Sequence, residues 1–263
     1  MILQIYGYLC HTMKPTPKIA LPVDDNKVIL HTCCAPCSCA IIERLLQNGI
    51  TPIIYYCNPN IYPYEEYIIR KNECTRYAEA LGLEIVDADY DHEAWCRWVE
   101  GLEREPERGG RCLECFKMRL LAAARYGAQR GIATITTTLA SSRWKSLAQI
   151  DEAGRWAVER VNAESIENQP TMVWWEQNWR KGGLQERRQA LLREYNFYNQ
   201  QYCGCEFSMR GKDLTSTIQV SLTESGISFA TVSKNEFVKS LTKPISFGNI
   251  GFSRRFHSFT VNL

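Results

Sequence analysis

Short apolar runs alternate with longer amphipathic segments over most of the chain. The apolar runs are rich in β-branched residues and predict buried strands at 28–32, 52–57, 83–88, 133–139 and 171–175. The segments between them carry apolar residues at helical spacing and predict helices at 36–47, 65–81, from His92 onward, 112–129, 142–162 and 184–198. Strands that alternate with helices predict an α/β fold, in which helices cover both faces of a parallel sheet.

Residues with distinctive chemistry follow the first three predicted strands. Cys33-Cys34 follows the first strand, a loop with two prolines and two asparagines at 58–63 follows the second, and Asp89-Tyr90-Asp91 follows the third. Ligands of parallel sheets bind beyond the carboxyl ends of the strands. The order of the segments therefore predicts a functional site at that edge of the sheet.

The composition is that of an ordinary globular protein. The chain has 263 residues, of which 45% are hydrophobic and 23% charged, and its net charge is +2. This charge gives no global reason to expect a nucleic-acid or membrane partner, so any such partner must be argued from a site. No apolar run is long enough to span a membrane, and the apolar start at 1–9 is too short for a secretory signal. We expect a cytoplasmic protein.

The character of the sequence changes near residue 208. Residues 210–263 contain no cysteine and carry seven basic residues against three acidic ones. We predict an N-terminal extension at 1–26, a main domain at 27–208 and a basic C-terminal extension of unknown role at 209–263. A poorly packed or strand-forming extension is favoured over a basic arm that contacts RNA phosphates.

Twelve cysteines are the unusual feature of the composition. They are too sparse for a disulfide scaffold, and clustered thiols in a reducing compartment are typical of metal ligands or redox groups. They form three groups: Cys33-Cys34 with Cys37 and Cys39 close by, Cys112-x-x-Cys115, and Cys203-Gly204-Cys205. We interpret the single cysteines as small buried hydrophobic residues: Cys10, Cys57, Cys74 and Cys96.

The first two groups together can supply a tetrahedral metal site. Cys112 and Cys115 stand at the start of a predicted helix, where free backbone N–H groups stabilise thiolate charge. Cys33 and Cys34 can supply two further ligands from the end of the first strand. Four thiolates bind zinc or an iron–sulfur cluster, and the spacing does not choose between them. For Cys37, packing is slightly favoured over metal binding.

Cys203 and Cys205 form a different kind of pair. Because one glycine separates them, a disulfide between them would be easily reduced, and the two thiols could store two electrons. The alternatives are further metal ligands or inert thiols.

Weaker candidates have structural alternatives. His31 either hydrogen-bonds a sulfur or is a core histidine. Asp89 and Asp91 are either proton donors or solvated loop acids. Arg180-Lys181-Gly182-Gly183 is either a phosphate contact or the cap of a helix. Five tryptophans either stack on bases or pack in the core, with the core favoured: Trp95, Trp98, Trp174, Trp175 and Trp179.

Taken in order, seven segments resemble the cobalamin-independent epoxyqueuosine reductases, the QueH family. The most distinctive read His31-Thr32-Cys33-Cys34-Ala35-Pro36-Cys37, Arg111-Cys112-x-x-Cys115-Phe116-x-x-Arg119 and Tyr202-Cys203-Gly204-Cys205. The segments span residues 30–38, 56–67, 89–91, 111–120, 136–139, 178–181 and 198–208. One departure is Ser142-Arg143-Trp144-Lys145, where the family usually has Ser-Pro-Tyr-Lys.

The resemblance implies a fold, an activity and a set of cofactors. The fold would be a three-layer α/β fold of the adenine-nucleotide-alpha-hydrolase (HUP) type. The activity would be reduction of epoxyqueuosine in tRNA to queuosine. It implies a [4Fe–4S] cluster on Cys33, Cys34, Cys112 and Cys115, a redox-active pair at Cys203 and Cys205, and an additional mononuclear iron with unassigned ligands. Because the sequence has no dinucleotide-binding motif, an external donor of the ferredoxin or flavodoxin type would be required.

Two rival functions follow from the same residues. A zinc-stabilised RNA-binding module without redox activity would use the same thiols. An ATP-dependent tRNA-modifying enzyme is disfavoured, because Cys33-Cys34-Ala35-Pro36 occupies the turn where a glycine-rich phosphate loop would lie.

Overall fold

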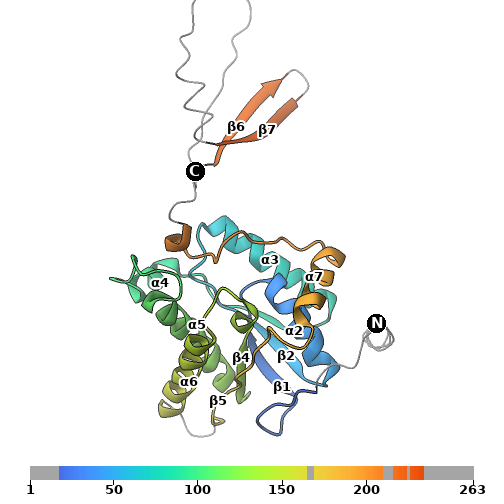
Figure 1. Cartoon of the computed structure of the whole chain (residues 1–263), viewed down its shortest axis with the longest axis vertical. Coiled ribbons are helices and arrows are strands. Elements are labelled where there is room, and N and C mark those ends of the chain that lie inside the picture. The colour runs from blue at the N-terminus through green and yellow to red at the C-terminus, as the bar shows by residue number, and fades with distance from the viewer. Residues whose placement is uncertain (1–17, 165–168, 210–215, 224–225, 234–263) are drawn as a thin grey trace, which may run out of the picture. The chain divides into compact units, whose positions relative to one another are not determined.

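The computed structural model describes residues 18–164, 169–209, 216–223 and 226–233. The chain divides into two compact units, Met1–Ser208 and Met209–Leu263. The first unit contains a five-stranded parallel sheet in the order β3-β2-β1-β4-β5 (Figure 1). Its strands are β1 (Lys27–His31), β2 (Thr51–Tyr56), β3 (Ile85–Asp87), β4 (Thr134–Thr137) and β5 (Val173–Trp174).

The middle of the sheet is formed by its most apolar strands. In the register of the sheet, Ile29 of β1 lies between Ile53 of β2 and Ile135 of β4. All three side chains are buried, as expected for a parallel sheet covered on both faces. The predicted three-layer α/β fold is confirmed.

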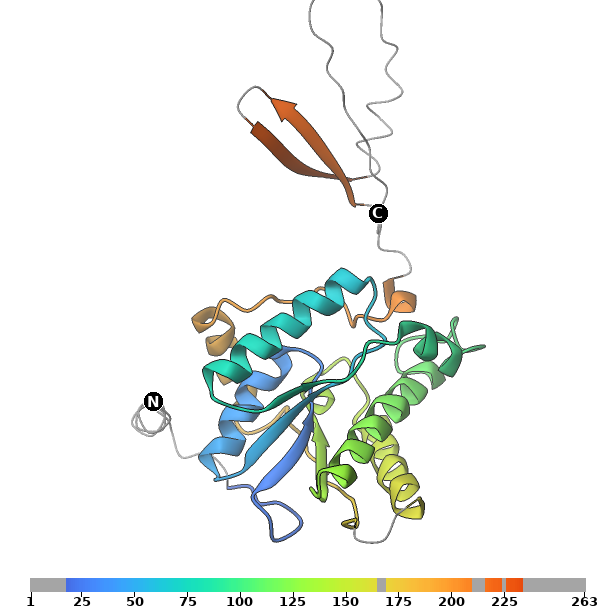
Figure 2. The ribbon, with the colours of Figure 1, turned by 180° about the vertical axis from the view of Figure 1, so that it is seen from behind.

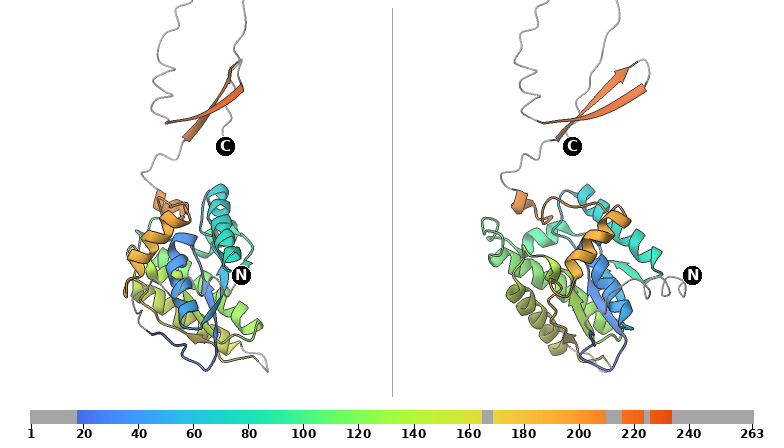
Figure 3. Two further views of the ribbon diagram at one scale, coloured as in Figure 1. Left: turned by 90° about the vertical axis from the view of Figure 1, so that its right-hand side faces the viewer. Right: turned by 45° about the vertical axis from the view of Figure 1, so that its right-hand side comes forward.

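Helices cover both faces of this sheet. Figure 1 shows α2 and α7 in front of the sheet, and Figure 2, from behind, shows α5 and α6. Helix α7 packs on α2, as the views of Figure 3 also show, while α5 contacts β1 and β4. The helices are α2 (Ala35–Gln47), α3 (Tyr64–Ala80), α4 (His92–Trp98), α5 (Gly110–Gln129), α6 (Leu147–Ala163) and α7 (Leu184–Glu194).

The helices begin and end where local chemistry favours it. Pro36 lies in the first turn of α2, where no helical partner for its missing N–H is needed. Gly49, Gly82 and Gly131 follow α2, α3 and α5 with φ of 74°, 67° and 71°. A left-handed conformation ends a helix, and glycine adopts it at little cost in conformational free energy because it has no Cβ atom.

The segment at 142–146 corrects one predicted helix. We expected a helix from Ser142, but β4 runs into a 3-10 helix, η1 (Thr138–Ser141), and α6 begins only at Leu147. The Ser146 side chain caps α6 by accepting from the Gln149 N–H. Arg180 donates to the carbonyls of Ser142 and Lys145, which satisfies both outside a helix. Lys145 therefore lies in a loop.

Other predicted elements were too long. The strands expected at 83–88, 133–139 and 171–175 are shorter, and the last is a two-residue edge strand. The helix expected to reach residue 198 ends at Glu194, because Asn196 adopts a left-handed φ of 48°. Asparagine tolerates this conformation better than most residues.

The tryptophans belong mainly to the core. Trp95, Trp174, Trp175 and Trp179 are buried, which confirms the packing interpretation for these four. Trp98 is 40% exposed and lies on the surface of α4. The alternative of base stacking is therefore disfavoured for the four buried indoles.

The second unit contains an antiparallel pair of strands, β6 (Ser216–Thr223) and β7 (Gly226–Ser233). This pairing confirms the strand-forming character of that part of the extension. The remainder of the extension and Cys10 lie outside the described residues. In the described part of the chain, no helix has the length and apolarity needed to cross a membrane.

Candidate metal and thiol site

Three cysteine thiols meet at the carboxyl end of β1. Cys33 and Cys34 follow the strand after Thr32, Cys34 is the N-cap residue of α2, and Cys37 lies in the first turn of that helix. Their sulfur atoms all lie within 4.8 Å of one another, and the Sγ atoms of Cys33 and Cys34 are 3.8 Å apart. We call these three residues the strand thiol group. It could hold a metal ion.

Two polar side chains contact the strand thiol group. Gln200 donates from Nε2 to the Cys34 Sγ at 2.9 Å, and the Thr138 hydroxyl donates to the Cys33 Sγ at 3.4 Å. Thr138 also accepts from the Cys33 backbone N–H at 3.2 Å. These donors fit sulfur atoms that carry negative charge.

The pKa values of the three thiols are shifted in different directions. Hydrogen bonds from Cys34 and Cys37, with smaller help from Thr138 and Arg119, lower the pKa of Cys33 well below its ordinary value. Burial raises the pKa of Cys34, and the hydrogen bond to Cys33 raises that of Cys37 to about 12. These shifts favour ionisation of Cys33 over ionisation of Cys34 and Cys37.

A second group of thiols lies at the start of α5. The Cys112 Sγ accepts from the Arg108 backbone N–H at 3.3 Å, and Cys115 packs with Cys205 in a small cluster around Trp95 and Val99. The charges of Cys115 and Cys203 contribute to raising the pKa of both Cys112 and Cys205. We call these four residues the helix thiol group. Burial raises the pKa of Cys112, and that of Cys205 to about 12.

The segment that carries Cys203 and Cys205 is fixed by α3. Arg70, which is 3% exposed, pairs with Glu66 at 2.7 Å and donates to the carbonyls of Tyr202 and Cys203, both at 3.2 Å. Gly204 accepts from the Tyr62 N–H at 2.8 Å. These contacts hold the backbone on both sides of the Cys203 side chain.

Two cationic side chains serve both thiol groups. Arg119 is 2% exposed and donates to the Cys115 Sγ at 3.8 Å and to the Cys57 carbonyl at 3.1 Å. Lys145 is half-buried and donates from Nζ to the Cys203 Sγ at 3.1 Å. The charge of Cys33 also acts on both cations. A buried charge persists only where it is paired, so the buried Arg119 guanidinium favours ionised thiols nearby.

Lys145 and Arg119 favour the ionised form of Cys203. Burial opposes ionisation, but the two positive charges outweigh it and lower the pKa of Cys203 below its ordinary value. Burial lowers the pKa of Lys145, and the Cys203 thiolate more than reverses this, so the pKa ends above its ordinary value. The two residues form a thiolate–ammonium pair.

His31 is a core histidine. Its Nε2 donates to the Cys57 carbonyl at 3.1 Å, and its Nδ1 accepts from the Thr137 hydroxyl at 2.7 Å. Burial, with help from Arg119, lowers the pKa of His31 to about 3, so the ring is neutral. This confirms the packing interpretation, and within the described ranges His31 forms no hydrogen bond to a sulfur.

The two aspartates at the end of β3 are exposed. Asp91 is the N-cap residue of α4 and accepts from the Ala94 N–H at 2.7 Å. Among the described residues, no hydrogen bond joins Asp89 or Asp91 to a cysteine. Arg180, the other polar candidate, supports the 142–146 loop, and Gly183 is the N-cap residue of α7.

The remaining cysteines divide into two kinds. Cys57 and Cys74 are buried, as predicted, and Cys39 is buried within α2 and donates to the Pro36 carbonyl at 3.7 Å. Cys96 is different, because it is half-buried and donates to Glu206 at 3.4 Å. Cys96 packs against the small cluster around Trp95 but is only partly buried, so the buried hydrophobic role predicted for it is confirmed only in part. The position of Cys37 favours metal binding over packing.

The donor atoms fit a thiophilic metal. All donor atoms of the two groups are cysteine sulfurs. The Oε1 atom of Gln200, whose Nε2 donates to Cys34, is buried with no partner in the described structure. The four ligands predicted from the sequence come from both groups, two from each, and their joint binding of one cluster stays a prediction.

Three side chains of the site were not identified as functional by sequence reasoning. Arg119 could have been found, because it stands four residues after Cys115 and thus on the same face of one helix. No local spacing connects Lys145 with Cys203 or Gln200 with Cys34, because each pair is far apart in the sequence.

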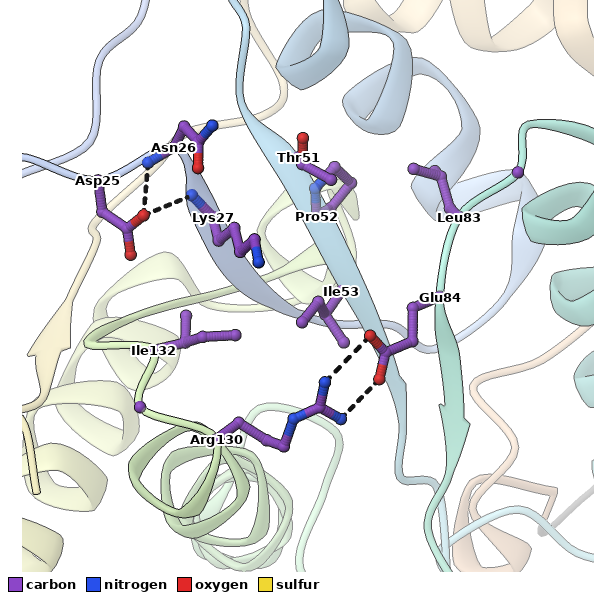
Figure 4. A pocket seen from close by; sticks show the side chains of 12 residues that line it. Asp25, Asn26, Lys27, Thr51, Pro52, Ile53, Leu83, Glu84, Arg130 and Ile132 are labelled. Carbon is purple, nitrogen blue, oxygen red and sulfur yellow. Dashed lines mark hydrogen bonds and ion pairs between the residues drawn. The ribbon is translucent and has the colours of Figure 1, made fainter. Parts of the chain in front are cut away.

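A hollow of about 540 Å³ lies at the opposite, amino end of the strands (Figure 4). Lys27, Thr51 and Ile132 line it, together with an ion pair of Arg130 and Glu84 at 2.6 Å. It contains none of the thiols. Ligands of parallel sheets bind at the other end, so we assign it no function.

Comparison with known proteins agrees with the thiol-rich site. A profile of the family described as "Epoxyqueuosine reductase QueH" matches residues 28–211. The chain is 44% identical to the epoxyqueuosine reductase QueH of Histophilus somni over 194 residues, which are 74% of this chain and 76% of the relative. It is 43% identical to that of Haemophilus influenzae over 193 residues, 73% and 76% of the two chains, and 29% identical to that of Thermotoga maritima over 185 residues, 69% and 90%. The chain therefore belongs to the QueH family of epoxyqueuosine reductases.

Proposed function

We propose that this chain reduces the epoxide of epoxyqueuosine, at the wobble position of tRNA, to give queuosine and water in the last step of queuosine biosynthesis. Its family membership supports this assignment. The structural observation that carries it is the pair of thiol groups at the carboxyl edge of the sheet, which share the cations Arg119 and Lys145. Thiols near fixed positive charge suit redox chemistry, because the thiolate is the reactive form.

The proposed reaction needs two electrons and two protons. Both C–O bonds of the epoxide break, a double bond forms between the two carbons, and the oxygen leaves as water. A site for this reaction must store electrons, deliver protons and stabilise the departing oxygen.

We assign the electron store to a [4Fe–4S] cluster on Cys33, Cys34, Cys112 and Cys115. Four cysteine thiolates are the usual ligands of such clusters, and these four belong to neighbouring thiol groups. When bound, the cluster supplies single electrons and a Lewis acid for the epoxide oxygen. Cys37 adds a further thiol beside it, which suits an additional mononuclear iron.

Cys203 and Cys205 act in this proposal as a dithiol. Its oxidation to a disulfide forms the S–S bond and releases two electrons, which matches the electron demand of the epoxide. With Cys203 as the thiolate, Cys205 supplies one of the two protons and a neighbouring acid supplies the other. Lys145 keeps Cys203 ionised and therefore ready to form the S–S bond. Because Arg70 fixes the backbone beside Cys203, the pair stays in place between turnovers.

Protons can reach the leaving oxygen from the residues around the thiols. Asp89 and Asp91 remain our proposed proton donors, on the basis of their position at the end of β3. Since Asp91 also caps α4, Asp89→Asn is the cleaner test of this role.

The 142–146 loop provides a surface for tRNA beside the site. Trp144 is 66% exposed and stacks with the guanidinium of Arg143 at 5.0 Å, while Lys145 of the same loop points to Cys203. Unstacked bases of an anticodon loop can stack on such an indole ring. We propose that Trp144 takes the place of the tyrosine usual in the family. A ferredoxin or flavodoxin would then return electrons to the site.

Two experiments test the proposed function. Transfer RNA from a strain that lacks this gene should accumulate epoxyqueuosine, detected by mass spectrometry of nucleosides, and the cloned gene should restore queuosine. Protein purified without oxygen should be brown, with the broad absorbance of thiolate-bound iron. A colourless protein that contains zinc and leaves epoxyqueuosine unchanged would instead support a zinc-stabilised RNA-binding module.

A further inference from the structure

A second cluster of metal-binding side chains lies outside the thiol groups. His92 and Cys96 are one turn apart on α4, and Glu206 begins the short helix η2 (Glu206–Met209). Their donor atoms all lie within 4.8 Å of one another. The Glu206 Oε1 is 3.2 Å from the His92 Nε2 and 3.4 Å from the Cys96 Sγ.

The hydrogen bonds of His92 determine which ring nitrogen faces the cluster. Its Nδ1 lies 2.7 Å from the Pro59 carbonyl, which can only accept, so Nδ1 carries the proton. In a neutral ring, the lone pair of Nε2 then faces the carboxylate of Glu206. Two acceptors in this position need a second ring proton or a cation between them. Metal-bound histidines usually donate their other N–H to a carbonyl or carboxylate in this way.

The cluster is held in place before any metal binds. The His92 ring stacks with Tyr62 and Trp95, both with centroids 5.4 Å away, and Trp95 stacks in turn with Phe207 of η2 at 5.8 Å. The side chains of His92 and Glu206 are 16% and 28% exposed. The donor atoms are thus ordered by packing and still reachable by an ion.

We propose that His92, Cys96 and Glu206 bind a zinc ion, with water at the fourth position. Nitrogen, sulfur and carboxylate oxygen are the donor atoms that zinc takes in proteins. Tetrahedral zinc with bonds of about 2.0–2.3 Å places its donor atoms roughly 3.3–3.7 Å apart, close to the two distances given above. Cys96 binds as a thiolate, so its proton passes to solvent when the S–Zn bond forms.

Such a zinc ion would tie the C-terminal segment of the unit to α4. Glu206 directly follows Cys205, so the ion would anchor one end of the segment that carries the two thiols. The inference does not depend on the proposed reductase activity, because the three ligands are outside the residues assigned to that reaction.

The test measures zinc in the protein that already carries its iron. Zinc per chain is counted by mass spectrometry, affinity is measured against a chromophoric chelator, and zinc X-ray absorption identifies the bound atoms. The variants are Cys96→Ser and Glu206→Gln, which preserve the size of each side chain. Glu93→Gln is the matched control, since Glu93 is an exposed carboxylate on the same helix that pairs with Arg97 at 3.9 Å.

We expect one zinc per chain with a single sulfur among its ligands. The affinity should fall by roughly tenfold or more in both variants, because each loses a ligand, and should be unchanged in the control. Three sulfur ligands would place the zinc in the strand thiol group and overturn the proposal. Equal affinity in wild type and both variants would also overturn it. Protein that contains no zinc and takes up none in the chelator titration would likewise overturn it.

Discussion

The two ends of the parallel sheet differ in how far their charged side chains are exposed to solvent. At the amino end, Arg130 and Glu84 pair across the open hollow with about two-fifths of each side chain exposed, at 43% and 44%. At the carboxyl end, Arg119 is buried and donates to the Cys115 Sγ. Buried charge must be compensated, whereas exposed charge is hydrated. In this protein, the buried charge lies at the candidate thiol site, whereas the hollow lies at the opposite end of the sheet.

The largest effect should come from removing a predicted cluster ligand. Cys115→Ala should abolish the iron–sulfur cluster and the activity, because three thiolates hold such a cluster poorly. Iron and sulfide per chain, with the absorbance spectrum, measure this. Cys74→Ala removes a buried thiol of α3 and should keep its iron. Retention of full iron content in Cys115→Ala would refute the ligand set.

The next largest effect should come from the thiol pair. Cys205→Ser should keep the colour but lower turnover by roughly a hundredfold, as expected for a group that takes part in the reaction. The measurement is queuosine formed on epoxyqueuosine tRNA with a chemical reductant. Cys203→Ser should behave in the same way. Unchanged turnover in either variant would remove the pair from the mechanism.

Loss of the Lys145 cation should alter the acidity of Cys203. Lys145 lowers the pKa of this thiol, so the thiolate persists to lower pH in the native chain, and Lys145→Met should move its ionisation to higher pH. Turnover at neutral pH should fall about tenfold. The pH dependence of Cys203 alkylation, followed by peptide mass spectrometry, measures the shift.

Lys181→Met is the control for that experiment, because Lys181 is an exposed lysine. The same alkylation profile in Lys145→Met and in the wild type would show that the thiolate–ammonium pair does not form in solution.

A smaller effect is expected at the surface of the 142–146 loop. Trp144→Ala should weaken tRNA binding by about 1–3 kcal/mol, the contribution of one stacked base, without changing kcat. Binding of epoxyqueuosine tRNA measured by filter retention tests this. Trp98→Ala, which removes another exposed indole of the same unit, should bind normally. Equal losses in both variants would speak against a specific stacking site.

The smallest effect should occur at the amino end. Arg130→Gln breaks an exposed ion pair and should leave melting temperature, iron content and turnover at wild-type values within error. Thermal melting and the tRNA assay measure these. A strong loss of turnover in this variant would contradict the contrast between the two ends of the sheet.

The order of the elements could be predicted because each short apolar run was compatible with a buried strand and not with a helix. Ile29, Ile53 and Ile135 lie in runs too short for helices, between glycines and prolines that end the adjacent segments. The boundaries were less predictable. The segment at 142–146 carries a helical pattern, but the side chains of Arg180 and Ser146 take the hydrogen bonds that a helix would need.

The thiols of the site could be predicted, and their partners could not. Cys33 and Cys34, Cys112 and Cys115, and Cys203 and Cys205 stand at short spacings that local patterns describe. Lys145 and Gln200 reach these thiols only through the tertiary fold, over separations of 58 and 166 residues. Cys96 shows the same limit, because a single cysteine in a helix gives no sign of a carboxylate from a distant segment.

Gly204 has a consequence for comparing relatives of this chain. Its φ is 107°, and a Cβ atom at this position would lie 2.8 Å from the Ile61 side chain. Natural variation at the position between the two cysteines should therefore be confined to glycine wherever the loop keeps this path. A homologue with a bulkier residue there would have to route its backbone differently, and would thereby identify a branch in which the two sulfurs are presented in another way.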